Sequence, residues 1–319
     1  MRAAAAAARL RAGSRGEPVA GPEARVEAAA EAGPDRRQDR GEAEPRARAA
    51  PSTLAQLALA IVEADTLAGK LAPMPSGAPD EPRGTALRVE APVRPHELRV
   101  QPARAGRVPP VAGMHDREQR ARILHALANH ELQAVELFAW ALLAFPAAPA
   151  RFRRGLAVIL GEEQRHMQLY MDRLAAHGHR MGDFPLTGHF WNHLGQFSSP
   201  RHFVCVMGLT FENANLDFAQ EYAAAARAVG DAETADVLGQ VHRDEIRHVR
   251  FAWRWLLRFA GEQVSGWRSY VDSLAPPLGP GRARGREMCV ASRRAAGLDD
   301  EFIDGLAAAA PTRPSGAPR

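Results

Sequence analysis

Asp244-Glu245-Ile246-Arg247-His248 is the stretch that decides how this sequence folds. Glu245 and His248 are three residues apart, which places both side chains on one face of a helix, one turn apart. A similar stretch, Glu162-Glu163-Gln164-Arg165-His166, occurs earlier in the chain. A single Glu-x-x-His arises by chance on surface helices, but here acid-Glu-x-Arg-His occurs twice. The repetition indicates a site that two helices build together.

Both stretches lie in apolar stripes of helical periodicity. Helices are predicted over about 116–144, 151–177, 199–229 and 231–259, with a long crossover loop at 178–199. Apolar residues recur along them in steps of three and four, and one glutamate stands in the middle of each stripe. These glutamates are Glu131, Glu163, Glu212 and Glu245.

The pattern repeats at nearly equal separations. Glu131 and Glu163 are 32 residues apart, and Glu212 and Glu245 are 33 apart. Two similar hairpins would therefore bring these carboxylates and two imidazoles to one point. A buried, unpaired carboxylate costs on the order of several kcal/mol, so divalent cations are the simplest partners. Carboxylates and imidazoles suit iron or manganese, while the lack of thiolates argues against structural zinc. The predicted ligands are Glu131, Glu163, His166, Glu212, Glu245 and His248.

The sequence predicts an all-α protein, a four-helix bundle with a long crossover. Residues 1–50 contain almost no large apolar side chains, so we expect a disordered Ala/Arg-rich tail. Residues 51–110 should form an N-terminal helix and a proline-rich arm that pack on the bundle, which itself spans 111–262. Residues 263–319 should form a C-terminal extension with a short helix at about 298–309 and a tail.

Composition excludes several classes of function. The chain has 41 Lys and Arg against 37 Asp and Glu, and its arginines are scattered, so no nucleic-acid partner is expected. Cys205 and Cys289 form no Cys-x-x-Cys pair, which excludes an iron–sulfur or rubredoxin-type centre and a disulfide framework. No apolar run approaches the length of a membrane span, about 18 residues, and no signal peptide is evident, so we expect a cytoplasmic protein without membrane contact.

Four stretches carry a resemblance to known proteins. They are the two acid-Glu-x-Arg-His stretches, His130-Glu131-Leu132-Gln133-Ala134-Val135-Glu136-Leu137, and Phe211-Glu212-Asn213-Ala214-Asn215-Leu216-Asp217. They resemble the ferritin-like superfamily and, within it, a family of unknown function, over roughly residues 51–310. The resemblance implies a ferritin-like bundle and a metal site, without naming a substrate.

The paired motif is also similar to that of bacterial diiron monooxygenases. In those proteins the acid before the ligand glutamate orients a histidine. The resemblance thus implies that Glu162 and Asp244 support the ligand imidazoles, which need a partner for their second nitrogen.

Two further residues lie one helical turn from the ligands. Tyr170 follows His166 and could hydrogen-bond near the metals or donate an electron, although a core tyrosine is the simpler interpretation. His242 precedes Glu245 and could be an extra ligand, a residue that supports the ligands, or a solvent-facing histidine.

Other polar residues are expected outside the site. Glu136 and Asp217 each follow a ligand glutamate by five residues, about 140° round the helix, so they should point away and form other pairs. Histidines 189, 193 and 202 in and near the crossover could control access, but their spacing does not require it.

The favoured function is a dinuclear carboxylate oxidoreductase that activates dioxygen or peroxide on an unknown small molecule. Its cofactor would be two iron ions, or a manganese and an iron ion, with His166 and His248 on one metal each. Either Glu163 and Glu245, or Glu131 and Glu212, would bridge the metals. An unknown external electron donor is required, because no flavin or iron–sulfur motif is present.

Two alternatives remain at this stage. One is non-catalytic metal binding or iron handling, which we rank lower because long arms would hinder assembly of a storage shell. The other is a bundle in which the polar residues form only an ion-pair network. The sequence leaves open the substrate and whether the chain forms a homo-oligomer.

Overall fold

A computed structural model of the chain describes residues 50–75, 77–81, 83–102 and 108–310. Within these ranges the chain is helical, and its one β-type contact is an isolated bridge between Val100 and Leu186. The all-α prediction is therefore confirmed. No helix in the described ranges is long and apolar enough to cross a membrane. The predicted tail at 1–50 lies outside the described residues, except for residue 50.

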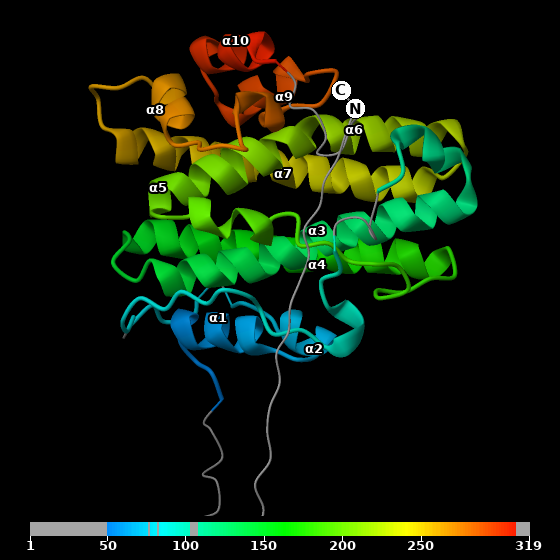
Figure 1. Ribbon diagram of the computed structural model, residues 1–319, viewed down its shortest axis with the longest axis horizontal. Coiled ribbons are helices and arrows are strands. Elements are labelled where there is room, and N and C mark those ends of the chain that lie inside the picture. The colour runs from blue at the N-terminus through cyan, green and yellow to red at the C-terminus, as the bar shows by residue number, and fades with distance from the viewer. Residues whose placement is uncertain (1–49, 76, 82, 103–107, 311–319) are drawn as a thin grey trace, which may run out of the picture. The chain divides into compact units, whose positions relative to one another are not determined.

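Four long helical segments pair as two hairpins (Figure 1). The first hairpin consists of α3 (Arg117–Ala144) and α4 (Ala150–Ala176). The third segment begins as α5 (Pro200–Phe203), continues as η4 (Val204–Glu212) and ends as α6 (Asn213–Ala228), and it pairs with α7 (Ala232–Ala260). Contacts between α4 and α7 join the hairpins. The crossover between them contains the short helix η3 (Trp191–Gln196).

Side-chain caps explain where these helices begin. Asp116 accepts a hydrogen bond from the backbone N–H of Gln119, and Ser199 accepts one from His202. Asp231 caps α7 through Thr234 and also pairs with Arg173, which ties the start of α7 to the end of α4.

The third segment departs from the regular helix that its periodicity predicts. η4 is a π-helix of nine residues, and Thr210 donates its hydroxyl to the carbonyl of Cys205, five residues back. Gly208 lets η4 approach α7, because a Cβ atom there would lie 2.2 Å from the Cβ atom of Ala252. The π-helix ends at Glu212, in agreement with the tendency of such turns to occur at functional sites.

Replacing Gly208 by alanine is expected to lower the free energy of unfolding by about 1–3 kcal/mol, the usual cost of overpacking. The added methyl group would force η4 and α7 apart at Ala252. Urea unfolding followed by circular dichroism measures the change. Gly195→Ala is the matched control, because nothing lies within 4 Å of its added Cβ atom. Equal stability of the two variants would contradict this account of the contact.

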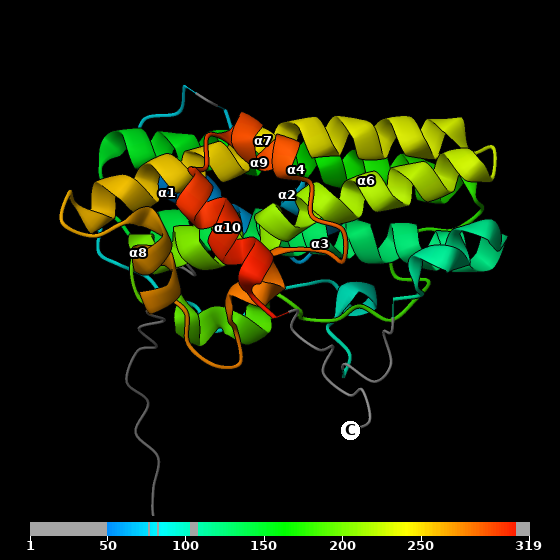
Figure 2. The same cartoon turned by 90° about the horizontal axis from the view of Figure 1, so that it is seen from above.

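The segments before and after the long helices cover opposite faces of the two hairpins (Figure 1). Helices α1 (Leu54–Glu63) and α2 (Leu67–Lys70) pack on α3; the single helix predicted there is broken near Thr66, which caps α2. The arm that follows contains η1 (His96–Leu98) and η2 (Val111–His115). On the α7 side lie α8 (Gly266–Asp272), η5 (Pro280–Ala283), α9 (Val290–Ala296) and α10 (Asp300–Ala308). Figure 2 shows α10 crossing the long helices at an angle.

Two buried acids fix these outer segments. Glu136 on α3 accepts two hydrogen bonds from Arg94, at 2.9 and 2.6 Å, and lies 3.2 Å from the Nζ atom of Lys70. Asp217 on α6 accepts two from Arg293, at 2.7 and 2.9 Å. Both acids point away from the ligand positions, as their spacing predicts, but they are buried ion-pair partners of the two extensions.

Candidate metal centre

The structure brings the predicted ligands together in two overlapping groups of four. In each group, one ligand atom from every residue lies within 4.8 Å of the others. The first group is Glu131, Glu163, His166 and Glu245, and the second is Glu163, Glu212, Glu245 and His248. Two glutamates, Glu163 and Glu245, belong to both groups. This buried cluster of carboxylates and imidazoles could hold metal ions.

Four helical segments supply the cluster. Glu131 comes from the middle of α3, Glu212 from the end of η4, and one Glu-x-x-His pair from each of α4 and α7. All six side chains are buried, and none is more than 6% exposed. Water therefore cannot solvate their charges, which must be balanced by one another or by a bound cation.

The acid that precedes each shared glutamate contacts the histidine of the opposite helix. The Nε2 atom of His166 on α4 lies 3.0 Å from a carboxylate oxygen of Asp244 on α7. The Nε2 atom of His248 on α7 lies 2.7 Å from a carboxylate oxygen of Glu162 on α4. Arg247 donates to both acids, at 2.8 Å to Glu162 and 2.7 Å to Asp244. The resemblance implies that these acids support the ligand imidazoles, and the structure places each acid beside the histidine of the other helix. This crossing between helices is not predicted by the sequence.

These contacts turn the Nδ1 atoms of both rings toward the carboxylates. The Nδ1 atom of His166 lies 3.3 Å from one oxygen of Glu163, and that of His248 lies 3.1 Å from the other. Neutral imidazole binds a metal through one nitrogen while the other donates to an acid, and here Nδ1 is the nitrogen free for that role.

The metal-free cluster distributes its charge unevenly. Burial opposes the charge of His166, but Asp244 and Glu163 outweigh it and raise the pKa of this imidazole to about 9. The pKa of His248 is also raised, since Glu163 and Glu162 outweigh burial. Conversely, burial first and the neighbouring carboxylates second raise the pKa of Glu131 and Glu212 well above the usual range. The metal-free cluster is therefore held by charged histidines around Glu163, with two carboxyl groups kept neutral.

Four buried atoms of the cluster form no hydrogen bond of normal geometry among the described residues, although two of them, His248 Nδ1 and Glu163 Oε1, lie 3.1 Å apart as an ion pair. The four are Glu163 Oε1, Glu212 Oε1, Glu245 Oε2 and His248 Nδ1. Buried polar atoms are normally hydrogen-bonded, so three carboxylate oxygens and one imidazole nitrogen without such bonds fit a site for cations. Oxygen and nitrogen atoms without thiolates suit iron or manganese.

One residue that contacts the cluster was not predicted from the sequence. The side-chain amide of Asn215 donates to Glu245 Oε1 at 2.9 Å. Asn215 lies three residues after Glu212, on the same helical stripe, so an amide in that stripe was the available signal.

Tyr170 is fully buried next to the cluster, and its hydroxyl group has no hydrogen-bond partner among the described residues. Burial is the main cause that raises the pKa of this phenol well above its usual range, and the neighbouring carboxyl groups add to it. Tyr170 therefore stays a neutral O–H group beside the carboxylates.

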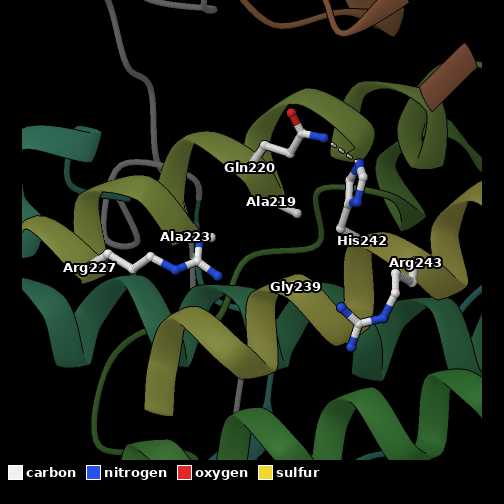
Figure 3. Close-up of a pocket in the computed structure, with 7 residues that line it drawn as sticks. All are labelled: Ala219, Gln220, Ala223, Arg227, Gly239, His242 and Arg243. Atoms are coloured by element: carbon white, nitrogen blue, oxygen red, sulfur yellow. Dashed lines mark hydrogen bonds between the residues drawn. The ribbon is translucent and has the colours of Figure 1, made fainter. Parts of the chain in front are cut away.

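His242 belongs to neither group of four. Its Nε2 atom lies 2.9 Å from the amide nitrogen of Gln220 and 2.9 Å from the hydroxyl of Ser292. The ring lines a cavity of about 370 Å³ between α6 and α7, together with Arg227 and Arg243 (Figure 3). His242 therefore contacts Gln220 and Ser292 and is not among the residues of the two groups.

Comparison with known proteins places the chain in a family. No curated protein and no solved structure matches it. A family model described as "Protein of unknown function (DUF455)" matches residues 44–304, a span that contains all six residues of the cluster. A match over most of the chain shows that the protein belongs to the DUF455 family.

Proposed function

We propose that the chain is a ferritin-like protein that holds two divalent metal ions, iron or manganese, between its two hairpins. Its function would be that of an oxidoreductase that activates dioxygen or peroxide. The observation that carries the proposal is the overlap of the two groups of four, which share Glu163 and Glu245. Two adjacent cations with two carboxylates in common need such an arrangement.

The overlap favours one of the two bridging arrangements that the sequence left open. Glu163 and Glu245 would contact both ions. Glu131 and His166 would complete one position, and Glu212 and His248 the other. The four carboxylates would balance the charge of two divalent ions, so binding would remove the electrostatic imbalance of the metal-free cluster.

The surroundings of Glu212 suit a reaction with a small apolar oxidant. Glu212 borders a small void. The rest of its lining is Gly208 and apolar side chains from α3, α4, the third segment and α7, among them Phe138, Met207 and Phe251. These side chains would exclude water from that side of the centre. When bound, a pair of reduced ions supplies two electrons and coordination positions open to dioxygen.

Iron handling without catalysis is the second candidate. Its support is the same cluster, since a storage protein also needs carboxylates to take up iron. The outer segments favour catalysis, because α1 covers α3 and α8 and α9 pack on α7, so much of the outer helix surface is already occupied. A storage shell would need such surface for contacts between copies.

Metal stoichiometry tests the proposal. The purified chain, loaded anaerobically with ferrous iron and freed of excess metal, is expected to contain about two ions per chain by elemental analysis. Glu245→Ala and His248→Ala should each lose at least one ion. Glu221→Ala is the control, because Glu221 is an exposed residue of α6. Iron near zero in the wild type would refute the metal site.

Oxygen exposure of the loaded protein separates the two candidates. A catalyst should consume oxygen repeatedly when a chemical reductant is supplied and keep its iron content constant. A storage protein should instead accumulate many ions per chain over successive additions of iron and oxygen. Stoichiometric oxidation with neither turnover nor accumulation would contradict both.

A further inference from the structure

A second cluster, which combines one arginine with imidazole and phenyl rings, lies beside the candidate metal centre, and we call it the Arg282 cluster. Its members are Arg282 of η5, His189, Phe190 and His193 of the crossover segment, His130 of α3 and Phe211 of η4. From the sequence alone, His189 and His193 could control access to the site, but their spacing does not require it. The cluster thus joins four parts of the chain: α3, the crossover segment, η4 and η5.

Arg282 and Phe211 form the centre of this cluster. The guanidinium group of Arg282 lies over the ring of Phe211, 5.2 Å from its centroid, and donates to the Nε2 atom of His189 at 2.8 Å. Phe190 stacks on Phe211 with a centroid distance of 4.8 Å, and His193 lies 5.4 Å from the same ring. One cation therefore lies among flat aromatic groups.

Arg282 has no carboxylate partner among the described residues. The fully or almost fully buried arginines of the described chain behave differently, because each forms an ion pair. Arg94 pairs with Glu136, Arg153 with Asp80 and Arg293 with Asp217. Arg282 is partly buried, and burial lowers its pKa. A guanidinium group that is partly shielded from water and has no acid beside it would be stabilised by an anion from outside the chain.

The neighbouring imidazoles do not supply a negative charge either. Burial first, and nearby cations including Arg282 second, lower the pKa of His189 to about 2 and that of His193 below its usual range. Neutral imidazoles can donate or accept hydrogen bonds without cancelling the charge of Arg282. A metal ion at His189 is disfavoured, because its Nε2 atom already accepts a hydrogen bond from the guanidinium group.

Chain connectivity places this cluster next to the candidate ligands. Phe211 directly precedes Glu212 on η4, and His130 directly precedes Glu131 on α3. The rings of Phe190 and His130 lie 5.2 Å apart, so the crossover segment covers the chain immediately beside both glutamates. A molecule held at Arg282 would thus lie alongside the α3 and η4 side of the centre.

We propose that Arg282 binds the carboxylate of a small organic acid whose flat apolar body packs against Phe190 and Phe211. A guanidinium group presents parallel N–H donors that match a carboxylate, and aromatic walls favour an apolar body over a bare phosphate. We further infer that such acids are the substrate class of the metal centre, a step that rests on the proposed function.

Calorimetric titration with benzoate tests the binding site in the metal-free wild-type chain. Benzoate is expected to bind, while benzamide, its neutral analogue of the same shape, should bind at least about tenfold more weakly, because it has no negative charge to pair with the guanidinium group and only one oxygen to accept from it. Arg282→Gln should weaken benzoate binding by about tenfold or more and change benzamide binding much less. Arg286→Gln is the matched control, since it removes the same charge at an exposed position four residues away.

Several outcomes would overturn the inference. The first two are undetectable binding of benzoate and equal affinity for benzoate and benzamide. The others are equal affinity of the wild type and a folded Arg282→Gln variant for benzoate, and tighter binding of inorganic phosphate than of benzoate. Circular dichroism checks that the variant is folded; if it is not, Arg282→Lys is used, which keeps the charge but should lose part of the affinity. Iron content is measured in parallel. If the chain binds benzoate but takes up no iron when loaded, only the proposed function is refuted. If it takes up iron but shows no charge-dependent binding of benzoate, only this inference is refuted.

Discussion

Glu163→Leu is expected to abolish iron binding and to lower the free energy of unfolding of the metal-free chain by about 3 kcal/mol. Glu163 belongs to both groups of four, so its loss removes a ligand from both metal positions. In the metal-free chain it lies 3.3 Å from His166 and 3.1 Å from His248, whose raised pKa values keep both rings charged. Leucine would leave these buried charges without their shared anion.

Glu212→Leu should have the opposite effect on the metal-free chain. Burial raises the pKa of Glu212, and its Oε1 atom has no partner among the described residues. Apolar residues such as Phe138 and Met207 lie around it, so leucine should be tolerated and could stabilise the metal-free chain by about 1 kcal/mol. Because Glu212 belongs to one group only, the variant should lose one of the two ions.

Urea unfolding of both variants, with and without ferrous iron, measures these effects. Glu221→Leu is the control, because it makes the same chemical change at an exposed position of α6. Iron should stabilise the wild type and the control by mass action, but not Glu163→Leu. If both variants at the cluster lost several kcal/mol and still took up two ions, the six residues would be a structural ion-pair network.

The sequence predicts the long helices well because two independent signals agree along them. Apolar periodicity identifies α3, α4 and α7, and capping residues such as Asp116 and Asp231 mark where α3 and α7 begin. The duplicated acid-Glu-x-Arg-His stretch then assigns the polar positions, because a buried glutamate at the same place in two helices needs a common explanation.

Features that depend on tertiary contacts were not predictable in the same way. No residue pattern in the sequence distinguishes the π-helix η4 from an α-helix. Its close approach to α7 at Gly208 depends on how the two helices pack, which periodicity does not predict. Composition shows that Lys70 is the chain's one lysine, but not that it is buried against Glu136. The proline-rich arm likewise lacks periodicity. The sequence therefore does not predict that Trp140 donates a hydrogen bond to the backbone carbonyl of Val89 in this arm.

The repeat extends beyond the ligands to the acids that hold the outer segments. Glu136 follows Glu131 by five residues, and Asp217 follows Glu212 by five. Each acid points outward from its hairpin and binds a buried arginine of an appended segment, Arg94 or Arg293. In each of the two segments, a candidate metal ligand is therefore followed five residues later by an acid that anchors an outer segment. Loss of an anchor should affect stability without touching the ligands.

Glu136→Ala and Asp217→Ala are each expected to lower the free energy of unfolding by about 3–5 kcal/mol, the loss typical of breaking a buried ion pair. Removing Glu136 leaves Arg94 and Lys70 buried without their acid. Removing Asp217 leaves Arg293 unpaired and takes the acceptor from two backbone N–H groups, those of Gly285 and Cys289. Urea unfolding of the metal-free variants measures the loss, and limited proteolysis should show that the corresponding extension is released first.

Glu118→Ala is the control on the same helix, because Glu118 and Arg122 form an exposed pair at 3.1 Å. Such a pair contributes about 0.3–0.5 kcal/mol, so this variant should remain close to the wild type. Iron binding by the folded fraction of Glu136→Ala should be unchanged, since Glu136 points away from the cluster. If Glu136→Ala lost no more stability than Glu118→Ala, the N-terminal arm would be held by its apolar contacts alone, and the buried ion pair would contribute little to the fold.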